Sequence, residues 1–166
     1  MSINAWPVGL DIDWRVMHFL RPKDWQLNHD GKNLANIGAK RRFSRFFEAD
    51  YDGHFISIEY RRKENSAVIV DLNRRIEIGV ISNLFHSDET LIILSDRNKF
   101  FIRNEKHKWV FKDEKGTMLA TTAFNNMNTP LESKFTLLEH PDKLGIHPGL
   151  IAVLSQYYSL QQGLGY

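Results

Sequence analysis

The stretch "PGLIAVLSQYYSLQQG", residues 148–163, decides the fold, because its apolar residues follow a helical spacing that the rest of the chain lacks. Its large apolar side chains are Leu150, Ile151, Val153, Leu154, Tyr157 and Tyr158. Pro148 suits the first turn of a helix and Gly163 suits its end. No Asp, Glu, Lys or Arg occurs in 144–166. The sequence therefore predicts an uncharged helix over 148–162.

The opposite face of this helix is formed by Ala152, Ser155 and Ser159, which are small and uncharged. An exposed helix normally carries charges on that face, so we expect protein to enclose this one. Residues 150–162 would span about 20 Å, whereas the hydrocarbon core of a membrane is about 30 Å thick. We therefore expect a buried helix and no transmembrane segment.

The remainder of the chain alternates apolar and polar residues with a period of two, which is typical of strands with one buried face. In "RIEIGVI", residues 75–81, Ile76, Ile78 and Val80 share one face. The same pattern predicts strands over 12–20, 24–28, 33–39, 41–49, 54–61, 66–71, 75–81, 90–95, 99–104, 108–112, 117–123 and 133–140.

The segments between these strands are short and rich in Asp, Asn and Gly, as in "HDGK", "DYDG" and "SDRN". Most are too short for crossover helices, so consecutive strands should be antiparallel neighbours. A dozen such strands must close into a barrel or split into two sheets to protect their edges. The uncharged helix favours closure around it. We predict one all-β domain over 1–166, a closed antiparallel β-barrel enclosing the C-terminal helix.

Two segments of the chain repeat one pattern, "WQLNHDGKNLA" at 25–35 and "WVFKDEKGTMLA" at 109–120. Each places a Trp and an apolar residue two positions later on the same face, before a turn that contains Gly. Each therefore predicts a hairpin whose Trp points inward. The two copies either occupy equivalent places in two halves of the barrel or match by coincidence.

Composition limits the functional classes. The 166 residues carry 22 basic and 20 acidic side chains, so we expect no nucleic-acid partner. The chain has no cysteine, which excludes disulfides and thiolate chemistry. The first residues, "MSINAWPVGLDIDW", lack the basic and apolar regions of a signal peptide, so we expect a cytoplasmic protein.

With its two Trp hairpins and its apolar terminal helix, the chain resembles the tubby C-terminal-like superfamily, and within it the LURP-one-related proteins. That resemblance implies a closed antiparallel barrel threaded by a hydrophobic C-terminal helix. It also implies membrane lipid association as a theme of the family. No tubby phosphoinositide contact can be assigned to a residue of this sequence.

No catalytic motif is present: the chain has no Gly-x-Ser-x-Gly elbow, phosphate-binding loop or dinucleotide fingerprint. The best metal candidates, Glu139, His140, Asp142 and His147, lie in "EHPDKLGIHP". Two His-Pro steps are more typical of a turn than of a ligand set. We therefore predict no catalytic residue, no metal site and no cofactor.

Basic residues gather where alternating strand directions bring two connections to one end of the barrel. The predicted binding residues are Lys40, Arg41, Arg42, Arg61, Arg62 and Lys63. Arg74 and Arg75 should lie at the opposite end, because a strand of about six residues separates the two ends by roughly 20 Å. The alternative interpretation is that these side chains only solvate strand ends and block edge pairing.

These observations favour a non-enzymatic binding module that presents its basic residues to anionic phospholipid headgroups or to an acidic protein, peripherally at the membrane. A lipocalin-like carrier of an apolar small molecule is a second hypothesis, and it requires an empty lumen. An enzyme with an unrecognised site on the loops, such as "AFNNMNTPLE", is a third.

Overall fold

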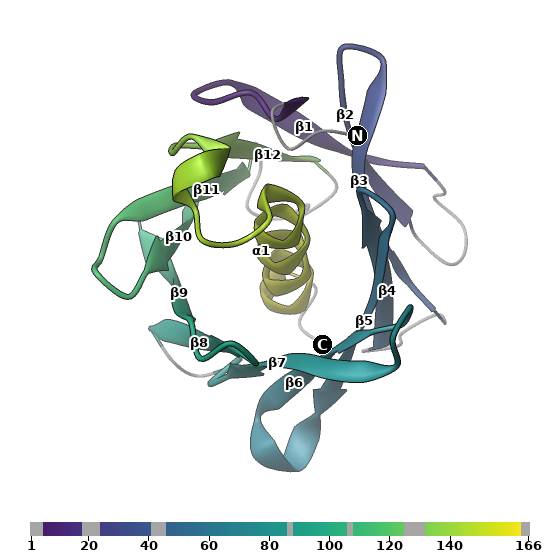
Figure 1. Ribbon diagram of the computed structural model, residues 1–166, viewed down its shortest axis with the longest axis vertical. Coiled ribbons are helices and arrows are strands. Elements are labelled where there is room, and N and C mark those ends of the chain that lie inside the picture. The colour runs from purple at the N-terminus through teal and green to yellow at the C-terminus, as the bar shows by residue number, and fades with distance from the viewer. Residues whose placement is uncertain are drawn as a thin grey trace.

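The computed structural model confirms the predicted fold: twelve antiparallel strands form a closed barrel around one C-terminal helix (Figure 1). The structure describes residues 5–17, 24–40, 46–85, 88–105, 108–124 and 132–163. Each strand pairs with its neighbours in the sequence, and β1 closes the ring by pairing with β12. Because the ring is closed, it leaves no free sheet edge.

The strands are β1 Asp11–Val16, β2 Asp24–His29, β3 Lys32–Ala39, β4 Phe46–Tyr51, β5 His54–Arg61, β6 Ser66–Asp71, β7 Ile76–Ser82, β8 Glu89–Leu94, β9 Lys99–Glu105, β10 Lys108–Asp113, β11 Met118–Phe124 and β12 Glu132–Leu137. The helix α1 spans Pro148–Gly163, and short 3₁₀ turns span Arg62–Glu64 and Pro141–Lys143.

The two ends of the barrel differ in the length of their connections. At the turn end, where α1 begins, consecutive strands are joined by tight turns such as Asp52 and Gly53 between β4 and β5. At the loop end, where α1 finishes, several connections in the sequence are longer. The Gln162 side chain donates a hydrogen bond to the Leu84 carbonyl there.

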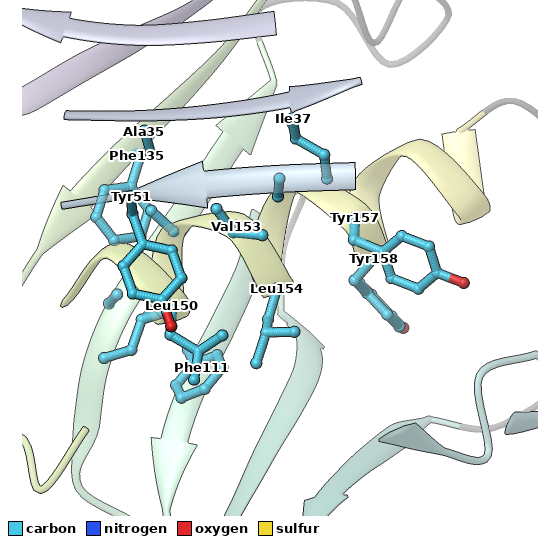
Figure 2. Packing of buried hydrophobic residues seen from close by; sticks show 14 of the residues in the cluster. Ala35, Ile37, Tyr51, Phe111, Phe135, Leu150, Val153, Leu154, Tyr157 and Tyr158 are labelled. Carbon is cyan, nitrogen blue, oxygen red and sulfur yellow. The ribbon is translucent and has the colours of Figure 1, made fainter. Parts of the chain in front are cut away.

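The helix α1 fills the lumen and forms the centre of the core. Val153 and Leu154 are fully buried against the barrel wall (Figure 2). Ile151 and the small residues of the opposite face are buried too. The Tyr157 ring meets Phe47 of β4 edge to face with centroids 5.5 Å apart, and Tyr158 meets Trp109 of β10 at 4.9 Å. The predicted enclosure of the helix is therefore confirmed. Within the described ranges, no helix has the length and apolar character needed to cross a membrane.

Three observed strands differ from the prediction by more than one residue at a boundary, and the other strands agree with it to within one residue. The first strand ends at Val16, not at residue 20, and the last ends at Leu137, not at 140. The strand predicted over 41–49 is observed as Phe46–Tyr51 and extends to the residue before a two-residue turn. Residues 41–45 lie outside the described part of the chain. In the sequence, the alternation of apolar and polar residues extends beyond the residues that form hydrogen bonds with a neighbouring strand. Where the strand ends is decided by the partner strand, which the pattern does not show.

The repeated Trp segments form hairpins β2–β3 and β10–β11, with both Trp rings directed to the core as predicted. The strand register shifts by a bulge or irregularity at the same point of each hairpin, directly after the apolar residue two positions beyond Trp. In β2 the shift lies between Leu27 and Asn28, and in β10 it lies between Phe111 and Lys112. In ring order, however, β2 is the second strand of the first six, whereas β10 is the fourth strand of the second six. The idea that they occupy equivalent places in two halves is therefore wrong.

Candidate binding surfaces

The basic residues at the end of β5 form a compact, exposed turn. Arg61 is the last residue of β5, and Arg62 and Lys63 begin the 3₁₀ turn that follows. None of the three side chains is buried. We call Arg61, Arg62 and Lys63 the basic turn. Glu64 closes the same turn and adds one negative charge beside three positive ones.

Asn65 fixes the basic turn to the neighbouring β7–β8 connection. It adopts a left-handed backbone, with φ 48°, and its N–H donates to the Arg62 carbonyl. Its side chain forms two hydrogen bonds with the Phe85 backbone, accepting from the N–H at 3.0 Å and donating to the carbonyl at 2.8 Å. The Leu84 N–H donates to the Asn65 carbonyl at 3.1 Å. The three cations therefore project from a turn with a defined geometry.

Lys40 lies at the same end of the barrel but is separated from the basic turn by β4. Its backbone N–H donates to the Phe46 carbonyl, and Phe46 pairs with Glu59 of β5. Its Nζ lies 3.2 Å from Glu48 Oε1 and 5.2 Å from the centre of the Phe46 ring. Lys40 is therefore engaged on the outer wall. Arg41 and Arg42 lie outside the described residues.

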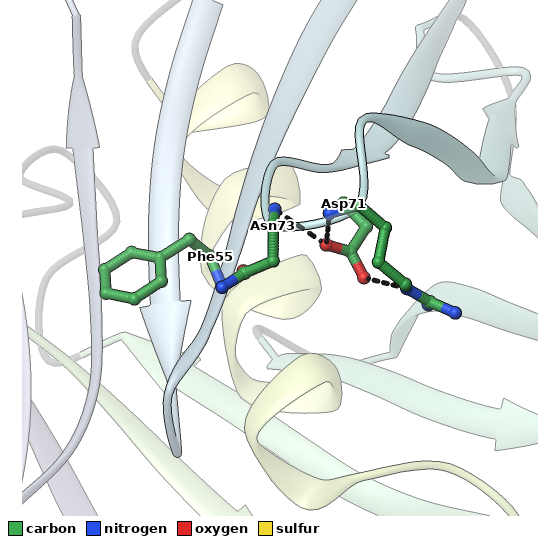
Figure 3. A network of polar contacts seen from close by, with 4 residues as sticks. Phe55, Asp71 and Asn73 are labelled. Carbon is green, nitrogen blue, oxygen red and sulfur yellow. Dashed lines mark hydrogen bonds and ion pairs between the residues drawn. The ribbon is translucent and has the colours of Figure 1, made fainter.

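Arg74 and Arg75 lie in the β6–β7 turn, at the turn end, so β6 separates them from the basic turn at its other end. Asp71 accepts hydrogen bonds from the Arg74 N–H at 3.1 Å and from its Nε at 2.9 Å (Figure 3). These bonds from the Arg74 backbone and side chain lower the pKa of the Asp71 carboxyl. Arg74 is thus part of the turn's own structure.

The histidines of "EHPDKLGIHP" have structural partners. His140 Nδ1 accepts a hydrogen bond from the Asp142 N–H at 3.3 Å. His147 Nδ1 accepts from the Gly149 N–H at 2.9 Å, at the start of α1, so its Nε2 carries the proton that faces Asp52 Oδ2 at 3.2 Å. Burial lowers the pKa of His147, and the Asp52 carboxylate opposes that effect. The described residues contain no group of three or more His, Asp or Glu able to hold a metal ion.

An open groove of about 530 Å³ lies on the outer wall of the barrel, over β2, β3 and β4. Paired positions place Asp24, Gly38 and Glu48 in one row across these strands. The next row contains Gln26, Asn36 and Asp50, with Phe55 of β5 opposite Asp50. Among the lining residues are three carboxylates, Asp24, Glu48 and Asp50, and one cation, Lys40. The groove is therefore acidic, whereas the nearby basic turn is positive.

Backbone and side-chain hydrogen bonds hold the far wall of this groove in place. The Leu72 N–H donates to the Phe55 carbonyl at 2.8 Å. The Phe55 N–H donates to Asn73 Oδ1 at 3.0 Å (Figure 3). The Phe55 and Leu72 side chains remain exposed, at 52% and 39%. In Figure 3 the Phe55 ring points away from the polar network of the turn. Together they form an apolar shelf beside Asp50.

The sequence patterns above do not predict this groove. The segment "DYDGHF", residues 50–55, contains part of the signal, because a two-residue Asp-Gly turn sets Asp50 opposite Phe55. The remaining contact, from Asn36 to Asp50, depends on the register between β3 and β4. The sequence predicts this strand over 41–49, whereas β4 spans Phe46–Tyr51. The pairing of Asn36 with Asp50 could therefore not be predicted from the sequence.

Comparisons with known proteins give no family for this chain. No protein-family model and no curated protein matches the sequence, and no solved structure matches the fold.

Proposed function

We propose that this protein is a non-enzymatic binding module that associates with anionic phospholipid headgroups through the basic turn, acting in the cytoplasm at the membrane surface. The observation that carries the proposal is the clamp by Asn65, which holds Arg61, Arg62 and Lys63 together at the loop end. Each basic residue near an anionic surface contributes about 1 kcal/mol. Three cations held on one turn therefore give weak, salt-sensitive attraction.

Two further features support a module of this kind. The lumen of the barrel is filled by α1, so a ligand must bind on the outside, which argues against a carrier of an apolar molecule. The closed barrel with a threaded C-terminal helix also has the architecture that the resemblance to tubby-like and LURP-one-related proteins implies. We propose membership of that superfamily, with lipid association as its consequence.

Vesicle co-sedimentation tests the proposal. We expect the wild-type protein to sediment with vesicles that contain phosphatidylserine at low salt and to be released at high salt, because the Debye length shrinks from about 10 Å at 0.1 M to about 3 Å at 1 M. Replacing Arg61, Arg62 and Lys63 with Glu should weaken binding by at least roughly two orders of magnitude, since three contributions of about 1 kcal/mol are lost.

The turn end provides a matched control. Arg75, Arg97 and Lys99 are exposed basic residues there, and replacing all three with Glu changes the net charge by the same amount. This control should retain binding. A separate Arg41→Glu/Arg42→Glu variant tests the two predicted residues that lie outside the described part of the chain. The proposal fails if the wild-type protein ignores acidic vesicles at low salt, or if both triple variants lose binding equally.

A further inference from the structure

We propose that the Asp50 end of the outer groove binds an arginine side chain from an extended segment of a partner protein. This site lies on the wall of the barrel and does not depend on the lipid proposal.

The groove combines carboxylates with an exposed aromatic ring. Glu48 and Asp50 are two residues apart on the outward face of β4, which places them about 7 Å apart along the strand. Asp50 lies directly opposite Phe55, so their side chains start about 5 Å apart. Asp50 forms no ion pair with any described residue, and the Phe55 ring is about half exposed. A cation placed here would meet both a carboxylate and a ring face.

The chain already uses this combination one row away. Lys40 Nζ lies 3.2 Å from the Glu48 carboxylate and 5.2 Å from the centre of the Phe46 ring. One cation of this chain therefore occupies the Glu48 end of the groove. The Asp50 end has the same two elements, a carboxylate and an aromatic ring, and is filled by none of the described cations.

Asp50 is held in position to receive a planar donor. Asn36 Nδ2 donates to both of its carboxylate oxygens, at 2.7 and 3.0 Å, and Asn33 in turn bonds Asn36. Each carboxylate oxygen has two lone pairs, so both can still accept a hydrogen bond from a guanidinium group. Arginine fits better than lysine, because its planar group pairs in a bidentate manner with a carboxylate and also stacks on an aromatic face.

The apolar shelf indicates that the arginine belongs to a protein segment. Leu72 lies beside Phe55 and remains exposed at the edge of the groove. In an extended chain, residues two positions apart point to the same side and lie about 7 Å apart. Asp50 and Leu72 lie on either side of Phe55, about 10 Å apart across two strand spacings. Because an arginine side chain is long, a segment with arginine and an apolar residue two positions later can place the guanidinium group on Asp50 and the apolar side chain on Leu72.

Nuclear magnetic resonance titration of the whole protein tests the site. The probe is an acetylated and amidated Gly-Arg-Ala-Leu-Gly peptide, compared with versions that carry lysine or neutral citrulline in place of arginine. We expect the arginine peptide to shift the backbone amides around Asp50, Phe55 and Leu72 in a saturable manner. The lysine peptide should bind more weakly, and the citrulline peptide should leave these amides unchanged.

Two groove variants and one control define the outcome. Asp50→Asn keeps the shape and its bond to Asn36, and should weaken binding of the arginine peptide roughly tenfold. Phe55→Leu should reduce the preference for arginine over lysine. Glu59→Gln removes an exposed carboxylate on β5 that does not line the groove, and should change nothing. Equal binding of arginine and citrulline peptides, equal loss in Asp50→Asn and Glu59→Gln, or no saturable shift in the groove would each overturn the proposal.

Discussion

Replacing Gly149 with alanine tests how closely α1 is seated against the barrel wall. A Cβ atom at Gly149 would lie 2.6 Å from Tyr51 Cβ and 2.7 Å from Tyr51 Cγ and Cδ2. These atoms form the root of a buried side chain whose position β4 fixes, so they cannot swing aside. The helix or the strand must therefore move to make room for the new methyl group. The burial of Tyr51, together with the nearby Asp71 charge, also raises the pKa of its hydroxyl to about 12.

Two opposing effects decide the size of the change. Alanine is favoured over glycine in a helix interior by about 1 kcal/mol, and less in the first turn. Overpacking a close contact costs about 1–3 kcal/mol. Because α1 is enclosed on all sides, it has no free direction in which to move, and the overpacking cost should exceed the gain. We expect Gly149→Ala to lower the free energy of unfolding by about 1–2 kcal/mol, which corresponds to roughly 2–8 °C in Tm.

Urea denaturation followed by circular dichroism measures this change, and a double-mutant cycle assigns it to the contact. Tyr51→Gly removes all three atoms that the new methyl group would meet. In that background, Gly149→Ala should cost nothing or should stabilise the protein. A neutral or stabilising effect in the wild-type background would refute the close seating of α1. An equal penalty in both backgrounds would show that Tyr51 is not the obstacle.

Two more predictions concern the same helix. Deleting Leu150 onward should abolish folding. Each large apolar side chain lost contributes about 1.5–3 kcal/mol, and the sum over several of them exceeds the stability of a typical domain. A truncated chain that retained a cooperative melt and a native near-UV spectrum would contradict this prediction. Since the folded pKa of His147 is below its usual 6.5, the unfolded state binds the proton first, and wild-type stability should fall as the pH drops from 6.5 through that lower pKa. His147→Asn, which retains an acceptor for the Gly149 N–H, should lose this part of the pH dependence in denaturation measured from pH 7.5 to about 5, and an unchanged slope would disprove the assignment.

Local patterns were enough to predict the architecture. Period-two alternation and Asp-Gly turns give antiparallel neighbours, and the uncharged segment 148–162 requires an enclosed helix. Both signals are read within a few residues, so they survive without knowledge of the partner strand. The pairing of β1 with β12 has no local signal in the sequence. Closure was predictable only from the number of strands, whose edges need protection.

Contacts between distant segments could not be predicted in the same way. Gln156 interrupts the apolar helix in the sequence, and its partner is Ser133, whose hydroxyl donates to Gln156 Oε1 at 2.8 Å from β12. The left-handed backbone of Asn65 belongs to a short turn within one stretch of sequence. Its hydrogen bonds to Phe85, in contrast, join residues that are 20 positions apart. Strand register decides these pairs, and a single-residue shift would move every side chain to the other face.

The position of α1 also explains why binding is expected on the outside and at the loop end. The turn-end connections between strands, 30–31, 52–53, 72–75, 95–98 and 114–117, span at most four residues. At the loop end, 17–23, 40–45, 83–88 and 125–131 span six or seven, whereas 62–65, which contains the basic turn, spans four and 106–107 spans two. At the turn end, His147 and Gly149 fix the start of the helix against Asp52 and Tyr51, so a change there disturbs the core. The basic turn lies on a short connection, but its three basic side chains are exposed and away from the start of α1. A charge reversal in the basic turn therefore tests binding with little cost to the fold.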